Sequence, residues 1–428
     1  MLKRVLNKND LKSFIYNFFV IWNSFLIIFL LLLIFYPSKT KKTEQIPKGE
    51  FKLKLSSLKK FQNIGENLFS IASLPLSKNL IVTSKEGIIS QLNNQNFSSI
   101  FILSFNPISK NIKTFNDYII FSTENELFLL KSLGKKIWHL NFNQEIKNFN
   151  ILYNKKNFYI VVSTPNTLYT ITKNGKVFKK FLLNQLLFSE IISYDFNNDS
   201  FDDIIIGTTE NIYLLDGRTL NILWEKSINS IYPGKFSLLK NKNELYIIVP
   251  LYSGKILVLN KYGLLVWETE ANSQIVSAPV SFKNIKNELC FIQKTLDNKI
   301  IFFNFTKRKK ENEISFEKPF ELCLADLNFN NPPEIITVTE DGIINIIENQ
   351  ILIDKFNLYL EENEKIISNI IADDIDKDGK AEIIFSSNKG NVYAISYYVK
   401  IGILKTIFKK INRWYQYGGD ERNLFKFN

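Results

Sequence analysis

The sequence is built from pairs of short apolar runs, and a polar turn separates the two runs of each pair. Examples are NLIVTSKEGIISQL (residues 79–92) and EIIFSSNKGNVYAI (residues 382–395), in which the turn contains Ser or Thr and a glycine. Apolar runs of this length that are bounded by turn residues predict buried β-strands. The pattern therefore predicts an all-β protein over most of the chain.

The pair of runs occurs eight times. Each turn is marked by one residue, and these residues are Gly87, Asn125, Asn166, Glu210, Gly254, Asn298, Gly342 and Gly390. Successive turns are 38 to 48 residues apart, and a spacing of 44 is the most frequent. Such a period, with several short strands in each unit, is typical of a β-propeller blade. We predict an eight-bladed β-propeller over residues 51–398, with seven blades as the alternative. Residues 51–60 alternate partly between apolar and polar and could pair with the last blade to close the ring.

Several units continue to a second turn and a tryptophan, namely Trp138, Trp224 and Trp267, and Phe178 holds a comparable place. Four-stranded sheets cannot bury both faces alone, so neighbouring blades must cover each other. Large aromatic side chains contribute much of the packing energy in such contacts. We therefore interpret the tryptophans as contacts between blades and not as residues that stack on a ligand.

One polar loop has a spacing that suits a metal ion. Asp374, Asp376 and Asp378 fall at alternate positions, Gly379 permits a sharp turn, and Glu382 opens the next apolar run. A hard cation such as Ca²⁺ takes several oxygen ligands at short range, and a tight loop supplies them from every second residue. The loop precedes a strand and has Phe where an EF-hand has its twelfth-position Glu, so it is not an EF-hand. We predict a structural calcium site here.

The same loop pattern recurs twice with changes. Asp195, Asn197, Asp199 and Asp203 form a second candidate calcium loop. The third loop runs from Asp326 to Glu334, but amides replace acids within it and two prolines follow, so its charge is too low for a good site. The alternative for all three is an Asp/Asn turn without an ion, because these side chains bond to their own backbone.

The basic charge lies at the two ends of the chain. The net charge is +12, of which residues 1–42 carry +6 and residues 400–428 carry +5, so the body is almost neutral. This distribution argues against a nucleic-acid channel through the body and fits chain ends near anionic lipid. The two cysteines, Cys290 and Cys323, lie in apolar runs and need not pair, and the single histidine, His139, is interpreted as a strand residue.

Residues 14–36 are mostly apolar and long enough to cross a bilayer. No small-residue cleavage pattern follows, so we expect an uncleaved anchor, with a short basic segment (1–13) before it and a Lys-rich linker (37–50) after it. Flanking charges hardly set the orientation. We expect the propeller outside the cytoplasm, because weak calcium loops suit compartments with millimolar calcium.

The basic tail, residues 399–428, has apolar residues at helical spacing. It could lie as an amphipathic helix on a membrane surface, but we favour a helix or strand that packs on or near the last blade.

Two resemblances to known families follow from these motifs. LLDGRTLNILWEKS (residues 214–227) and VLNKYGLLVWETE (residues 258–270) resemble the quinoprotein-type (PQQ-like) propeller repeat. DFNNDSFDDIIIG (residues 195–207) and DIDKDGKAEIIFSS (residues 374–387) resemble the calcium-loop repeats of FG-GAP and VCBS propellers. The resemblance implies a propeller and calcium in these two loops, and it says little about function.

The preferred functional hypothesis is a membrane-anchored, non-catalytic scaffold that binds a protein partner at the cell surface or in the envelope. One alternative is a quinone-dependent dehydrogenase on the same fold, but the vicinal cysteines of that family are missing. Another is an envelope-assembly scaffold resembling the outer-membrane assembly lipoprotein propeller, although this chain lacks the lipid-carrying cysteine near its N-terminus. Fold alone does not decide among them.

Overall fold

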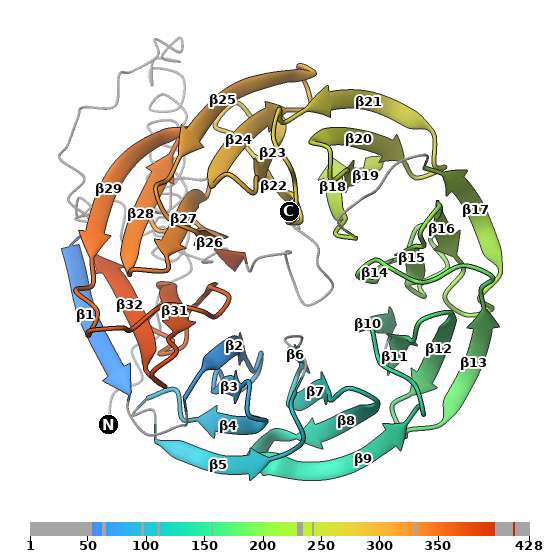
Figure 1. Ribbon diagram of the computed structural model, residues 1–428, viewed down its shortest axis with the longest axis horizontal. Helices are drawn as coiled ribbons and strands as arrows, with labels where there is room; N and C mark the ends of the chain where they lie inside the picture. Colours follow the sequence, from blue (N-terminus) through green and yellow to red (C-terminus); the bar gives the residue numbers. More distant parts are fainter. Residues whose placement is uncertain are drawn as a thin grey trace, which may run out of the picture. The chain divides into compact units, whose positions relative to one another are not determined.

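The computed structural model describes residues 54–61, 66–95, 98–108, 112–155, 157–228, 234–241, 244–328, 332–398 and 414–415. All of them belong to one compact unit, Lys52–Asn428. Eight antiparallel sheets follow one another around a ring, and each sheet contributes one blade (Figure 1). The prediction of an all-β, eight-bladed propeller is confirmed, and the seven-bladed alternative is excluded.

Within each blade the chain runs from an inner strand to an outer strand through tight turns, so that strands adjacent in sequence pair with each other. The first four blades comprise the following strands: β2 (Leu68–Ser73), β3 (Leu80–Ser84), β4 (Ile88–Leu92) and β5 (Ser99–Ser104); β6 (Ile112–Phe115), β7 (Tyr118–Ser122), β8 (Glu126–Lys131) and β9 (Lys135–Asn141); β10 (Asn148–Asn154), β11 (Asn157–Ser163), β12 (Thr167–Thr172) and β13 (Val177–Leu182); β14 (Ile192–Tyr194), β15 (Asp203–Gly207), β16 (Asn211–Leu215) and β17 (Ile222–Ser227). A single 3-10 turn, η1 (Ser132–Gly134), joins β8 to β9.

The last four blades repeat this plan. They comprise β18 (Ser237–Asn241), β19 (Glu244–Pro250), β20 (Lys255–Asn260) and β21 (Leu265–Glu270); β22 (Val280–Lys283), β23 (Leu289–Lys294), β24 (Lys299–Asn304) and β25 (Lys309–Ser315); β26 (Phe320–Ala325), β27 (Glu334–Thr339), β28 (Ile343–Glu348) and β29 (Ile351–Asn357); β30 (Ile371–Asp373), β31 (Glu382–Ser386) and β32 (Val392–Tyr398).

The eighth blade takes its outer strand from the other end of the chain. Strand β1 (Lys54–Phe61) pairs antiparallel with β32, with Leu58 opposite Ile395 (Figure 1). The first and last parts of the propeller are thereby joined in one sheet, which leaves no open end in the ring. The prediction that the segment near residues 51–60 closes the ring is confirmed.

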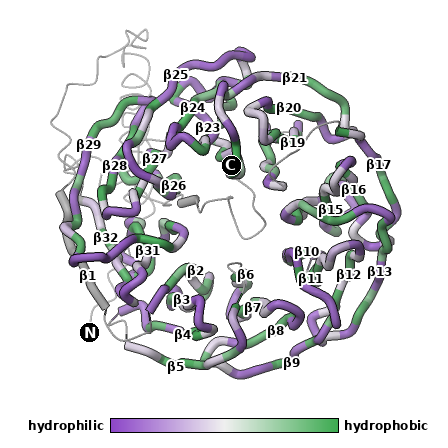
Figure 2. The backbone as a smooth tube through the Cα atoms, in the orientation of Figure 1, coloured by the Kyte–Doolittle hydropathy of each residue, from purple (hydrophilic) through white to green (hydrophobic). Residues whose placement is uncertain are grey.

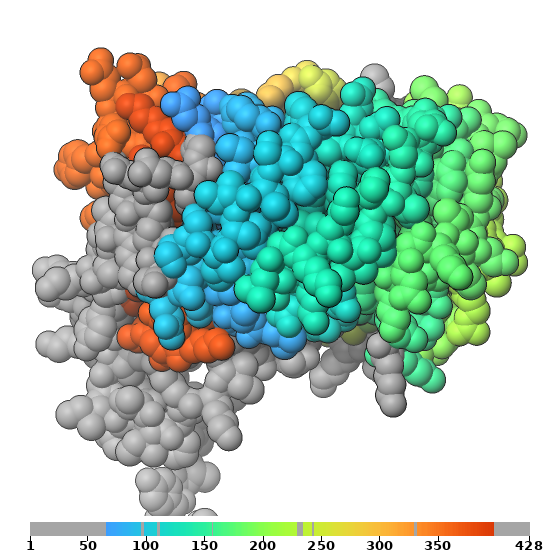
Figure 3. Space-filling view, turned by 90° about the horizontal axis from the view of Figure 1, so that it is seen from below, coloured from blue at the N-terminus to red at the C-terminus, as the bar shows by residue number. Residues whose placement is uncertain are grey.

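Burial follows the position of a strand in its blade. The middle strands are mostly buried, and β3 and β15 are buried along their whole length, because neighbouring blades cover both faces. The outer strands alternate between exposed and partly buried residues, as in β5 and β17. Figure 2 shows that hydrophobic residues are concentrated in the strands. Figure 3 shows the first blades following one another along the side of the ring.

Aromatic side chains of outer strands dock on the next blade, as the sequence predicts. Nε1 of Trp138 on β9 donates a hydrogen bond of 2.9 Å to the carbonyl oxygen of Lys173 in the third blade. Trp224 on β17 makes the same contact with Lys261 in the fifth blade, also at 2.9 Å. A Cβ on Gly175 would lie 2.9 Å from Cγ of Trp138, so the ring rests directly on the backbone of that turn. The interpretation of these tryptophans as contacts between blades is confirmed.

Other predictions on single residues are also resolved. His139 lies on β9 and stacks on Phe128, with ring centroids 5.6 Å apart. Cys290 and Cys323 are both buried and unpaired, in the sixth and seventh blades.

The predicted anchor, residues 14–36, lies outside the described residues together with its flanking segments. No helix in the described part has the length and apolar character needed to cross a bilayer. Of the basic tail, the structure describes only β33 (Trp414–Tyr415), which pairs with β26, the inner strand of the seventh blade. At these two residues the tail is a strand and not a helix, and Figure 1 shows β33 inside the ring.

Candidate metal centre

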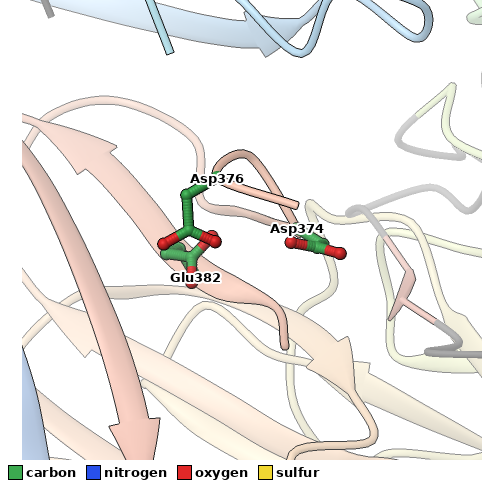
Figure 4. Close-up of side chains that lie close together, drawn as sticks. All are labelled: Asp374, Asp376 and Glu382. Atoms are coloured by element: carbon green, nitrogen blue, oxygen red, sulfur yellow. The ribbon is translucent and has the colours of Figure 1, made fainter. Parts of the chain in front are cut away.

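The loop between β30 and β31 brings three carboxylates together. Asp374, Asp376 and Glu382 each have one carboxylate oxygen within 4.8 Å of those of the other two, and Figure 4 shows the carboxylates of Asp376 and Glu382 next to each other with that of Asp374 beside them. Among the described residues this is the one group of at least three potential metal-ligating side chains of this kind. Three carboxylates at this separation repel one another unless a proton or a cation lies between them.

Glu382 holds the innermost position of this group. It is the first residue of β31 and is 3% exposed, and its Oε2 accepts a hydrogen bond of 3.0 Å from the backbone N–H of Ile375. Burial raises the pKa of Glu382 to about 8, and the negative charge of Asp376 adds to this effect. A divalent cation would reverse the shift, because it stabilises the ionised carboxylate.

Asp374 carries an oxygen that no protein group satisfies. Its Oδ2 accepts a hydrogen bond of 3.1 Å from the N–H of Gly379, whereas its Oδ1 is shielded from solvent and has no hydrogen-bond partner. Burial is the main cause that raises the pKa of Asp374. Buried oxygens without a partner are rare, and a bound cation is one way to satisfy them. The residues therefore fit a calcium ion by their chemistry.

Asp378, the fourth predicted ligand, points elsewhere. Its Oδ1 accepts a hydrogen bond of 2.8 Å from the backbone N–H of Lys380, and its Oδ2 lies 3.3 Å from Nζ of the same lysine. Asp376 supports the turn by accepting a hydrogen bond of 3.1 Å from the N–H of Asp378. The structure thus brings three of the four predicted residues together and places the carboxylate of Asp378 on the solvent side.

The second predicted loop, between β14 and β15, folds similarly but does not gather its carboxylates. Oδ1 of Asp195 and Oδ1 of Asn197 both accept a hydrogen bond from the N–H of Asp199, at 3.0 and 2.9 Å. Oδ2 of Asp199 lies 3.7 Å from the guanidinium of Arg218. Asp203 is buried, and its pKa is raised to about 7 by burial. Here backbone N–H groups and an arginine satisfy oxygens that a metal would otherwise need.

The third loop, between β26 and β27, ends in a similar buried acid. Oε2 of Glu334 accepts a hydrogen bond of 2.7 Å from the N–H of Leu327, and its Oε1 has no partner. Burial raises the pKa of Glu334 to about 8. Residues 329–331 of this loop lie outside the described part, so its other oxygens are not placed.

The three loops share one internal bond. The acid that opens the second strand of the blade accepts the N–H of the residue seven positions earlier, which is Phe196, Leu327 or Ile375. Each of these apolar residues is buried in the cluster between its own blade and the next. The acid therefore fixes the loop against the adjacent blade, which explains why its carboxylate is buried.

No local sequence pattern points to the contacts that the Asp374 loop makes with the first blade. Nδ2 of Asn94 donates a hydrogen bond of 2.7 Å to the carbonyl oxygen of Ile375. Nζ of Lys78 lies 2.8 Å from Oδ1 of Asp373, which directly precedes the loop. These partners are almost 300 positions apart, so only ring closure brings them to the site.

Comparisons with known proteins identify the fold of the chain but no family. No protein-family model and no curated protein matches the sequence. Solved structures that the chain resembles include BamB from Moraxella catarrhalis, with 15% identity and a TM-score of 0.58 over 80% of this chain and 97% of that one. The C-terminal WD40 domain of Sif2 has 15% identity and a TM-score of 0.60, and covers 80% of this chain and 99% of its own.

Sqt1 from Saccharomyces cerevisiae matches with 10% identity and a TM-score of 0.61, over 80% of this chain and 98% of that one. At such low identities the likeness concerns architecture alone. The chain is thus a β-propeller, similar in fold to BamB and to WD40 domains.

Proposed function

We propose that this chain is a membrane-anchored, non-catalytic scaffold whose propeller binds a protein partner and holds structural calcium in the Asp374 loop. The observation that carries the protein-binding role is a group of exposed apolar side chains on one face of the ring. This face, called here the connection face, carries the turns between the second and third strands of each blade and the links from one blade to the next. Exposed apolar groups that lie together are typical of interaction sites.

The group lies where the fifth blade meets the sixth. Tyr252, Val276 and Leu296 are 38%, 39% and 52% exposed. Two of them contact Gln274: the N–H of Leu296 donates to its carbonyl oxygen at 2.8 Å, and the hydroxyl of Tyr252 lies 3.4 Å from its Oε1. Turns held by such bonds present their side chains without much loss of entropy on binding, which favours a protein interface.

Co-purification from detergent-solubilised native membranes tests this role. We expect one partner to come down in a fixed ratio with the full chain, and we expect the Tyr252→Ser/Leu296→Ser variant to lose it. A matched control is Ile102→Ser/Leu182→Ser, which removes apolar side chains that are 52% and 63% exposed on outer strands. Equal loss of the partner in both variants would contradict a specific surface on the connection face.

The non-catalytic character rests on the chemistry of the reactive residue types. The single histidine stacks on Phe128 in a strand, and both cysteines are buried. Burial raises the pKa of Cys290 to about 12, and it raises that of Cys323 as well, so neither thiol ionises near neutral pH. Incubation with pyrroloquinoline quinone followed by absorption spectroscopy tests the dehydrogenase alternative, and a stable complex would favour it.

The membrane anchor remains part of the proposal and concerns residues 14–36. Their apolar length supports it, and the linker that follows would leave the propeller free outside the cytoplasm. The full chain should stay in the membrane during alkaline carbonate extraction. Deletion of residues 1–36 should release the protein. A truncated chain that still sediments with the membrane would show that another part of the protein binds it.

A further inference from the structure

A cavity of about 190 Å³ lies between the sixth and seventh blades, on the face opposite to the connection face. Its floor is apolar and comes from both blades, and it consists of Phe282, Phe302, Ile335 and Ile347. These four side chains are at most 7% exposed and belong to one hydrophobic cluster. The mouth is formed by the turn after β22, where Ile285 is 62% exposed, and by the turn between β28 and β29.

The chain itself shows what fills the corresponding place elsewhere in the ring. Phe201 is the seventh residue of the loop that starts at Asp195, and it is 2% exposed in the cluster between the third and fourth blades. Its ring lies 5.1 Å from the ring of Tyr159 in the preceding blade. The seventh residue of the loop that starts at Asp326 is Pro332, which lines the cavity. A smaller side chain thus stands where the other loop inserts an aromatic ring.

The volume decides the class of occupant. An apolar cavity of about 150 Å³ holds one benzene ring, whereas sites for whole cofactors or drug-sized ligands have about 300–1,000 Å³. The cavity here accommodates one ring and little more. Protein interfaces use such pockets for a single aromatic anchor.

Three charged groups of the cavity lining, Glu288, Lys307 and Glu311, are paired with one another. Oε2 of Glu288 accepts hydrogen bonds of 2.8 Å from Nζ of Lys307 and from Nδ2 of Asn304, which also donates to Glu311 at 2.9 Å. Nε2 of Gln350 donates to Oε2 of Glu311 at 2.7 Å. Both carboxylates are satisfied within the protein, so the rim favours a neutral side chain over a charged one.

We propose that this cavity receives the aromatic ring of a phenylalanine or tyrosine side chain of a partner protein. The inference rests on the proposed protein-binding function and adds an anchor point on the opposite face. The paired rim holds the mouth in place, and Ile285 offers an exposed apolar contact beside it. Insertion of a ring buries apolar surface that neither blade covers alone, as Phe201 does between the third and fourth blades.

The test uses the full chain in detergent and the blocked amino acid N-acetyl-L-phenylalaninamide as the probe. Saturation-transfer NMR should show binding of this probe and none of N-acetyl-L-alaninamide. Pro332→Phe should abolish binding, because it places a ring in the cavity from inside. Binding that is equally strong in this variant, or undetectable in the wild type, would overturn the proposal.

A second variant, at the surface, is needed because Pro332→Phe could lose binding through misfolding. Ile285→Glu places a charge at the mouth without touching the floor, and it should weaken the probe about tenfold. The matched control is Leu264→Glu, a position that is 63% exposed in the turn between β20 and β21, and it should bind as the wild type does. Circular dichroism and thermal melting of each variant confirm the fold, and equal effects of the two glutamates would contradict the cavity.

Two results separate this proposal from its premise. Phe329, in the same loop but outside the described residues, is the alternative occupant, and binding that occurs only in Phe329→Ala would overturn the partner proposal. If the probe binds but no protein co-purifies from membranes, the protein-binding function fails and the ring site stands as a small-molecule site. If a partner co-purifies but the probe does not bind, the cavity proposal alone fails.

Discussion

Nζ of Lys78 lies 2.8 Å from Oδ1 of Asp373, and this ion pair joins the first blade to the eighth. The side chain of Asp373 is fully buried, and that of Lys78 is 18% exposed. The N–H and the carbonyl oxygen of Ile71 also bond to the side chain of Asn369, each at 2.9 Å. Polar contacts therefore join the first and eighth blades, in addition to the pairing of β1 with β32. The Asp374 loop lies at this junction between the two blades.

Replacement of Lys78 by methionine should destabilise the ring strongly. The change leaves the buried carboxylate of Asp373 without its counter-charge, which typically costs about 3 kcal/mol. Chemical denaturation of the two proteins measures the difference. Lys310→Met is the control, since it removes an ion pair with Glu313 whose partners are 31% and 44% exposed. That pair should be worth less than about 1 kcal/mol, and similar losses in both variants would argue against a special role of the junction.

Calcium should raise the melting temperature of the full chain, and a chelator should lower it, because a ligand that binds only the folded state stabilises that state. Asp376→Asn should remove most of this response, since its carboxylate belongs to the group with Asp374 and Glu382. Asp378→Asn is the matched control, because Asp378 already bonds to Lys380. Differential scanning calorimetry with and without EDTA decides, and an unchanged melting temperature in the wild type would remove the calcium proposal.

Much of the ring could be predicted from the sequence, because each blade repeats the same local signals. The apolar pairs around Gly87 and Gly390 define strands without reference to any distant residue. The spacing of Asp374 and Asp376 also indicated the loop in which their carboxylates lie close together. The contacts that could not be predicted join residues of different blades. An example is Lys78 beside Asp373, 295 positions away in the chain.

The direction of single side chains was a further limit. Asp378 fits the alternating pattern of ligands as well as Asp376 does, yet it turns toward Lys380. The cavity beside Pro332 depends on the volume left between two sheets, which no local pattern reports. Similarly, the pairing of β33 with β26 adds a strand from outside the repeats, and the repeat pattern carries no information about it.

Glu334 should make the protein less stable as the pH rises. Burial raises its folded-state pKa to about 8, above the unfolded value of about 4.5, so the folded state binds more protons between these values. Stability is then fully retained below the unfolded pKa and falls as the pH increases toward the folded one. Glu334→Gln, which keeps the shape without the ionisable proton, should lose less stability between about pH 5 and pH 9 in urea denaturation. Identical pH profiles would show that Glu334 ionises freely in the folded protein.

The stacking of Trp138 on Gly175 can be tested by a double-mutant cycle. Gly175 has a φ of 78°, and an added Cβ would lie 2.9 Å from the indole, so Gly175→Ala combines backbone strain with a clash. The strain alone costs about 1–2 kcal/mol, and the clash should add about 1 kcal/mol or more.

In the background of Trp138→Leu the clash is relieved, so Gly175→Ala should cost only what the backbone strain costs. The two substitutions should therefore be non-additive, with a coupling of at least about 1 kcal/mol. Additive losses would mean that the indole does not press on the turn of the third blade. Trp138 would then contact the third blade through its hydrogen bond from Nε1 to Lys173 and through the shared hydrophobic cluster, and Trp138→Phe measures the loss of that hydrogen bond with an aromatic ring retained.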